Sequence, residues 1–164
     1  MASGQFFDPL TLLRVTPLVA SSASLWLAVE EHRYLNIFLL LKDRSKVNEI
    51  LPSYFEKFFY TTFPYLLSTF GITIATGVTN FYSRPNKALP WYAAGTALTL
   101  AHFAFVPGVM WKVKATIEAK PEPNGSGADE VKRWLAVHRV RSIFADFPAW
   151  ACFFIAVLKS LKSI

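Results

Sequence analysis

Four long apolar stretches occupy more than half of this 164-residue chain. They cover residues 10–29, 58–82, 88–113 and 143–161. About 20 apolar residues in a helix cross the roughly 30 Å hydrocarbon core of a bilayer at 1.5 Å of rise per residue. The sequence therefore predicts an all-α fold, an integral membrane four-helix bundle in which residues 1–164 form a single transmembrane domain.

The composition agrees with a chain that lies in lipid. Hydrophobic residues make up 53% of it and aromatic residues 16%, more than is usual for soluble domains. The net charge of +6 comes from basic residues next to the apolar stretches. Such residues usually meet anionic lipid headgroups, so we expect the lipid bilayer as a partner and no nucleic acid. The single cysteine, Cys152, excludes an internal disulfide.

The distribution of basic residues predicts the orientation. An even number of spans brings both termini to one side, with 5 of the 17 Lys and Arg residues, and the other 12 lie on the opposite side. The smaller set consists of Arg14, Arg84, Lys87, Lys159 and Lys162. The positive-inside bias then places residues 30–57 and 112–142 in the cytosol. The termini would be non-cytosolic, in the endoplasmic reticulum or a similar endomembrane if the cell is eukaryotic.

Two connecting segments have distinctive compositions. Glu30, Glu31 and His32 follow the first span, and we expect them to be solvated near its mouth. Residues 34–41 are apolar but too few to cross, which predicts a separate interfacial or packed helix. Residues 120–130 are rich in Pro, Gly and Ser and read as a flexible cytosolic linker.

The second span carries a polar stripe. Thr69, Thr73, Thr76 and Asn80 are spaced i, i+4, i+7 and i+11, so they share one helical face that should point into the bundle. The stripe has two interpretations. Its members could make hydrogen bonds between helices, or Thr73 and Asn80 could line a polar pocket that binds substrate.

Ionisable residues inside the spans mark the candidate site, because a charge in hydrocarbon is costly. Helix direction places His102 roughly 10–15 Å from the cytosolic end of the third span. His138 and Arg141 lie at the cytosolic mouth of the fourth span, and Asp146 lies about 7 Å deeper. We therefore expect these four residues to converge in the cytosolic half of the bundle and to be catalytic.

The approach to the fourth span suits an acidic aromatic ligand. Trp134, His138 and Arg141 share one helical face. A ring could stack on Trp134 or Arg141, the guanidinium could bind an oxygen, and either His138 or His102 could move a proton. Structural roles stay open for the same residues. Trp134 and Arg141 could anchor the helix at the interface, Asp146 could pair with Arg141, and His102 could bond a Ser or Thr hydroxyl.

Metal and nucleotide motifs are absent from the sequence. No HExxH, CxxC or Glu-x-x-His element occurs, and no two histidines stand three or four residues apart. Neither GxGxxG nor GxxxxGK[ST] is present. We expect no metal and no cofactor.

Three segments carry a resemblance to a known family. They are AHFAFVP at residues 101–107, RWLAVHRVRS at residues 133–142, and the small-residue first span with Pro17 and Ala20. With them the chain resembles the small four-helix membrane proteins typified by the anthrone oxygenases of polyketide pathways. The resemblance implies a monooxygenase-type oxidoreductase of secondary metabolism that converts a phenolic anthrone to a quinone without metal or flavin. It further implies His102 and His138 as base candidates, Arg141 as holder of the enolate oxygen, and Trp134 as part of an aromatic wall.

Three functions are compatible with the sequence. The first is a membrane enzyme acting on a lipophilic aromatic small molecule inside a dry chamber. The second is a scaffold that recruits soluble enzymes through residues 42–57 and 112–141. The third is a small transporter in which the polar stripe and Asp146 line a route. Because the chain shows no duplicated halves, transport would require a homo-oligomer.

Overall fold

The chain folds into four long helical rods in a computed structural model that describes residues 8–83 and 85–161. All the regular elements of the described residues are helical, as the sequence predicted. They are α1 (Pro9–Leu40), α2 (Arg44–Tyr82), η1 (Asn86–Ala88), α3 (Leu89–Ala101), η2 (His102–Phe105), α4 (Val106–Ile117), α5 (Gly127–Arg141), η3 (Ser142–Asp146) and α6 (Phe147–Ser160). The elements α3, η2 and α4 form one continuous rod, and α5, η3 and α6 form another.

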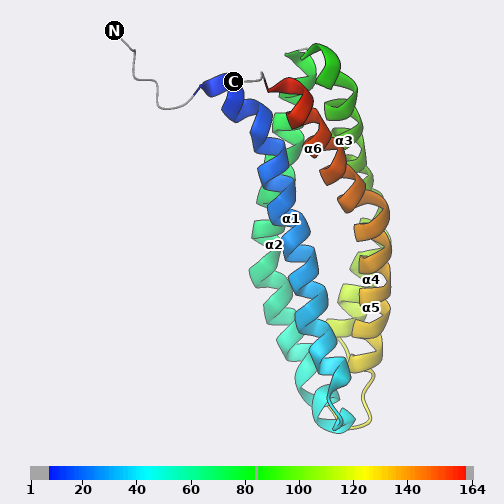
Figure 1. Cartoon of the computed structure of the whole chain (residues 1–164). Helices are drawn as coiled ribbons and strands as arrows, with labels where there is room; N and C mark the ends of the chain where they lie inside the picture. The colour runs from blue at the N-terminus through cyan, green and yellow to red at the C-terminus, as the bar shows by residue number, and fades with distance from the viewer. Residues whose placement is uncertain (1–7, 84, 162–164) are drawn as a thin grey trace.

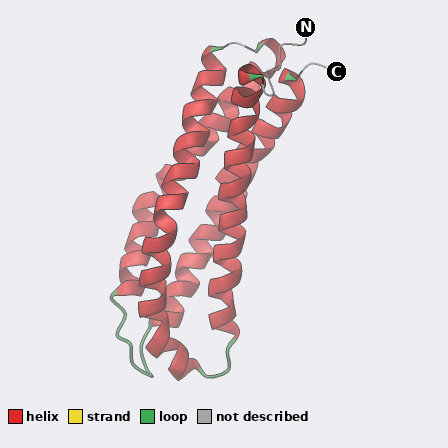
Figure 2. Cartoon of the chain, turned by 90° about the vertical axis from the view of Figure 1, so that its left-hand side faces the viewer, coloured by secondary structure: helices red, strands yellow, loops and turns green. Residues whose placement is uncertain are grey.

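The four rods lie side by side and alternate in direction (Figures 1 and 2). The start of α1 and the end of α6 lie together at the upper end in Figure 1. The connections at residues 41–43 and 118–126 lie at the opposite end. Of the basic residues counted on the side of the termini, Arg84 and Lys162 fall outside the described residues.

Three of the rods are long and apolar enough to cross a membrane: Pro9–Leu40, Leu89–Ile117 and Gly127–Ser160. The fourth, α2, has the length, with 39 residues. Its mean hydropathy is lower because Thr, Ser and Tyr are interspersed among its Phe and Leu residues. Large apolar side chains also cover the outside of the bundle, among them Trp26, Trp111 and Phe144, each more than 60% exposed. Such an outer surface suits an integral membrane protein.

Aspartates begin the first two helices. The Asp8 carboxylate accepts hydrogen bonds from the backbone N–H groups of Leu10 and Thr11, and Pro9 occupies the first helical position. The Asp43 carboxylate caps α2 in the same way. The separate helix expected at residues 34–41 does not form. Instead α1 continues to Leu40, because Leu35 is fully buried and extends the inner face of the helix.

Two irregular turns interrupt the third and fourth rods, each just before a proline. Pro107 has no N–H for the carbonyl of Phe103, and the preceding turn η2 tightens into a 3₁₀ helix. Pro148 likewise lacks an N–H, and the preceding turn η3 widens into a π helix in which the Phe147 N–H reaches the Ser142 carbonyl. His102 opens the first irregular turn, and Asp146 closes the second.

Apolar packing fills both ends of the bundle. The end with the 41–43 connection has a core that includes Leu51, Phe55 and Val131, all fully buried. At the other end, Phe153 packs so close to Gly95 that a Cβ on the glycine would lie 2.8 Å from the ring. Along the third and fourth rods, the buried His102 and Asp146 lie between residues of these two cores.

Candidate active site

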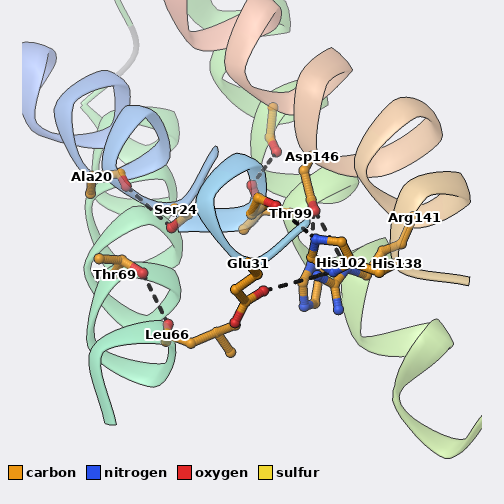
Figure 3. Close-up of polar contacts among 12 residues, drawn as sticks. Ala20, Ser24, Glu31, Leu66, Thr69, Thr99, His102, His138, Arg141 and Asp146 are labelled. Carbon is orange, nitrogen blue, oxygen red and sulfur yellow. Dashed lines mark hydrogen bonds and ion pairs between the residues drawn. The ribbon is translucent and has the colours of Figure 1, made fainter. Parts of the chain in front are cut away.

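Five ionisable side chains from three rods are buried together in the middle of the bundle (Figure 3). They are Glu31 from α1, His102 from η2, His138 and Arg141 from α5, and Asp146 from η3, each at most 9% exposed. The structure thus brings together the four residues that helix direction predicted to converge. It adds Glu31 to them.

His102 and Asp146 form a hydrogen-bonded dyad. The Nδ1 atom of His102 lies 2.7 Å from Oδ1 of Asp146. Because an ionised carboxylate can only accept, Nδ1 carries the hydrogen, and the lone pair of the neutral ring is on Nε2. The imidazole lines a cavity between the rods, and its Nε2 has no partner among the described residues. Asp146 therefore prepares His102 to accept a proton.

Both ring nitrogens of His138 are occupied. Its Nε2 lies 2.9 Å from the carbonyl oxygen of Ala28, to which it must donate. Its Nδ1 then accepts a hydrogen bond of 2.7 Å from Nη2 of Arg141. The indole of Trp134 stacks on the ring at a centroid distance of 4.8 Å. These two hydrogen bonds fix the tautomer of His138, and its Nδ1 holds the Arg141 guanidinium in place.

Arg141 links the dyad to His138. Its Nε lies 3.4 Å from Oδ2 of Asp146, and the guanidinium also lines the cavity. Arg141 and Trp134 are 6% and 4% exposed, so neither one is an interfacial anchor. Pairing between Asp146 and Arg141, one of the structural alternatives, does occur, and it coexists with the His102 bond.

Glu31 is the residue that sequence reasoning missed. We expected it to be solvated, yet it is 6% exposed, and its Oε2 lies 3.8 Å from Nδ1 of His138. It faces the same cavity as His102. A signal was present, because Ala28, Glu31 and Leu35 are spaced i, i+3 and i+7 and all three are buried on one face of α1.

The charges of the cluster leave room for one mobile proton. Arg141 contributes one positive charge, and Asp146 and Glu31 contribute two negative charges when both are ionised. With both imidazoles neutral, the group would be an uncompensated anion in a low-dielectric interior, which is costly. One added proton, on either an imidazole or a carboxylate, balances the group. An electrically neutral cluster therefore carries one proton in addition to those of the two neutral imidazoles.

An aromatic cavity adjoins the cluster. Its open space is about 70 Å³. It is lined by Glu31, Phe55, Phe58, Phe59, Thr62, Phe63, Leu66, His102, Val106, Val109, Met110, Trp134 and Arg141.

The two predicted residues of the polar stripe lie apart from this cavity. Thr73 borders a smaller space of about 10 Å³ next to Asp146, and its hydroxyl donates to the Thr69 carbonyl. Asn80 is fully buried farther along α2, where its amide donates to the Leu13 carbonyl of α1 at 2.7 Å. The contact of Asn80 is the bond between helices that one interpretation of the stripe predicted.

The donor set does not form a metal centre. Among residues 8–83 and 85–161, no three His, Cys, Asp or Glu side chains are arranged to hold a metal ion. In the cluster itself, His102 and Asp146 bond each other, and the nitrogens of His138 face Ala28 and Arg141. Apart from Nε2 of His102, the ring nitrogens of the cluster are thus engaged in hydrogen bonds.

Known proteins with related sequences are fungal. The chain is 30% identical over 158 residues to "Epoxidase pydX" of Acremonium sp, covering 93% of the chain and 96% of that protein. It is 29% identical over 155 residues to "Probable epoxidase scpX" of Mollisia scopiformis, covering 92% and 96%. It is 25% identical over 157 residues to "Epoxidase gkaX" of Penicillium citrinum, covering 93% and 96%. No protein family model and no solved structure matches the chain.

Proposed function

The chain belongs to the family that includes the epoxidase pydX of Acremonium, and from this we propose that it is a membrane oxygenase acting on a lipophilic substrate beside His102. Relatives named as epoxidases support oxygen transfer in secondary metabolism. We assign the reaction to the His102–Asp146 dyad because Nε2 of His102, which has no partner among the described residues, adjoins an aromatic cavity.

In the proposed first step, Nε2 of His102 removes an acidic C–H proton from the substrate. Asp146 accepts the Nδ1–H bond and stabilises the imidazolium that forms, and Arg141 stabilises the enolate oxygen. The apolar cavity dissolves dioxygen and limits the water that would return a proton to the carbanion. The carbanion then gives its electron pair to dioxygen, and a new C–O bond forms a peroxide.

The peroxide takes up the proton held by the cluster and becomes a hydroperoxide. In a substrate with a neighbouring double bond, its distal oxygen moves to the alkene. The O–O bond breaks, an epoxide forms, and an alcohol stays on the first carbon. Dioxygen is the oxidant, and its two atoms both remain in the product, so the step needs no external reductant.

The anthrone reaction implied by the family resemblance is the second candidate. Five aromatic side chains line the cavity, and a planar phenol would pack well among them. The same hydroperoxide, formed on a carbon that still bears a hydrogen, loses water to give the quinone carbonyl. One oxygen atom then enters the product and the other leaves as water.

Labelled dioxygen separates these outcomes. The protein in lipid nanodiscs would be given ¹⁸O₂ with either anthrone or a lipophilic β-diketone that carries an alkene. Mass spectrometry should find two labelled atoms in an epoxy alcohol, or one in anthraquinone. His102→Gln should remove the labelling, whereas Trp111→Phe, a change on the exposed surface, should not. Absence of label from both probes with folded protein, or full labelling by His102→Gln, would overturn the proposal.

We also propose that the end with the 41–43 and 118–126 connections faces the cytosol, which is supported by its excess of basic residues. A cysteine introduced by Asn124→Cys, at an exposed position of the 118–126 connection, in a Cys152→Ala background should react with a membrane-impermeant maleimide only from that side. Labelling from the lumenal side would reverse the orientation.

A further inference from the structure

A surface groove continues the cavity along the seam between α2 and α4. The groove has about 460 Å³ of open space. Three residues, Phe59, Phe63 and Met110, line both the groove and the cavity. The two spaces are therefore neighbours, separated by side chains and not by a helix.

The residues at this boundary are able to move. Phe63 is 39% exposed and Met110 is 43% exposed, so neither is locked in a packed core. Methionine is unbranched and adapts its shape to what it contacts. Gly108, which follows Pro107, is on the exposed face of α4, where a Cβ would meet nothing within 4 Å.

The cavity is too small for a lipophilic substrate by itself. Ligand sites for drug-sized molecules measure about 300–1,000 Å³, whereas the cavity offers about 70 Å³ beside His102. The groove between α2 and α4 adds about 460 Å³, which brings the combined space into the range of such ligand sites. Its walls are mainly apolar, and its far end carries the exposed Lys114–Glu118 pair, with Nζ 3.8 Å from Oε1.

We propose that the groove is the second half of the substrate site and that the substrate is elongated. This inference rests on the proposed oxygenase function only for the placement of the reacting end beside His102. The apolar remainder of the molecule lies along the seam past Phe63 and Met110, which makes these two residues determinants of specificity. A seam that opens on the side of the bundle lets such a molecule enter directly from the lipid.

The test measures binding, separately from turnover. Affinities of the protein in detergent would be determined for a series of linear enones of increasing chain length. Burial of one CH₂ contributes about 0.8 kcal/mol, so affinity should rise about fourfold per methylene until the groove is filled. Met110→Trp should flatten this dependence, and Phe63→Trp provides a second way to narrow the seam. Leu100→Trp, on the exposed face of α3, is the matched control.

A chain-length dependence that is the same in the wild type, both seam variants and the control would overturn the proposal. A wild-type series without any length dependence would overturn it as well. His102→Gln should abolish oxygenation but keep the length dependence, so failure of the oxygenase proposal and failure of the groove proposal give different results. Circular dichroism and melting would confirm that each variant is folded.

Discussion

The contrast between the two buried histidines gives the sharpest prediction. His102 offers a free Nε2 to the cavity, whereas both nitrogens of His138 are used within the protein. Glutamine in place of His138 can donate its amide to the Ala28 carbonyl and accept from Arg141, but it cannot take up a proton. His138→Gln should therefore keep most of the activity, and His102→Gln should lose about 10²–10⁴-fold, the usual contribution of a general base.

Replacing His138 with alanine should lower the stability of the bundle, because alanine makes neither of the two hydrogen bonds of the histidine ring. Its bond to Ala28 is between neutral groups, worth about 0.5–1.5 kcal/mol, and its bond from the Arg141 guanidinium is worth about 1.5–3 kcal/mol. The free energy of unfolding of His138→Ala should thus fall by about 2–4.5 kcal/mol, whereas His138→Gln should recover most of this.

The assay combines thermal melting in detergent with the ¹⁸O₂ turnover measurement on the same preparations. Melting identifies variants whose activity falls because the bundle unfolds, and turnover of the folded variants then reports on the chemistry. If His138→Gln melts like the wild type but loses as much activity as His102→Gln, then His138 takes part in proton transfer and the tautomer argument is wrong.

Three further predictions follow from buried contacts. Glu31→Gln removes a buried carboxylate that makes no hydrogen bond within residues 8–83 and 85–161, so the melting temperature should hold or rise while turnover falls. Unchanged turnover would show that Glu31 does not hold the proton used in the reaction. Asn80→Leu leaves the Leu13 carbonyl without its donor and should cost about 1–3 kcal/mol in denaturant unfolding, with the turnover of folded protein retained. Gly95→Ala places a Cβ 2.8 Å from the Phe153 ring and should cost about 1–3 kcal/mol by the same measurement, and wild-type stability would show that the ring can give way.

Much of the site could be predicted from the sequence because helix direction and rise fix depth. Counting residues from the ends of two spans was enough to bring His102 and Asp146 to the same level, and a 2.7 Å bond joins them. An ionisable side chain inside the membrane is costly unless it has a partner, and this cost identified Arg141 and His138 as residues that needed partners.

The parts that could not be predicted depend on contacts between distant segments. Glu31 stands in a run of charged residues, which is typical of a solvated helix end, and its burial depends on α1 continuing to Leu40 against the other rods. The role of His138 depends on the Ala28 carbonyl, 110 residues away in the chain, which decides the tautomer. The spacing of residues along one helix predicts neither the burial of Glu31 nor the tautomer of His138.

The widened turn at Ser142–Asp146 is the place where the fourth rod can change its length. Its i→i+5 hydrogen bond encloses one residue more than a regular α turn, so the loss of one residue from Ser142–Ala145 would let the turn tighten and leave α5 and α6 nearly in phase. A deletion within α5 or α6 has no such reserve, and at about 100° per residue it would rotate one part of the rod away from His102 or Gly95. Single-residue deletions should thus be tolerated better in this turn than in α5 or α6, and insertions or deletions among relatives should fall in this turn or in the connecting segments at residues 41–43 and 118–126.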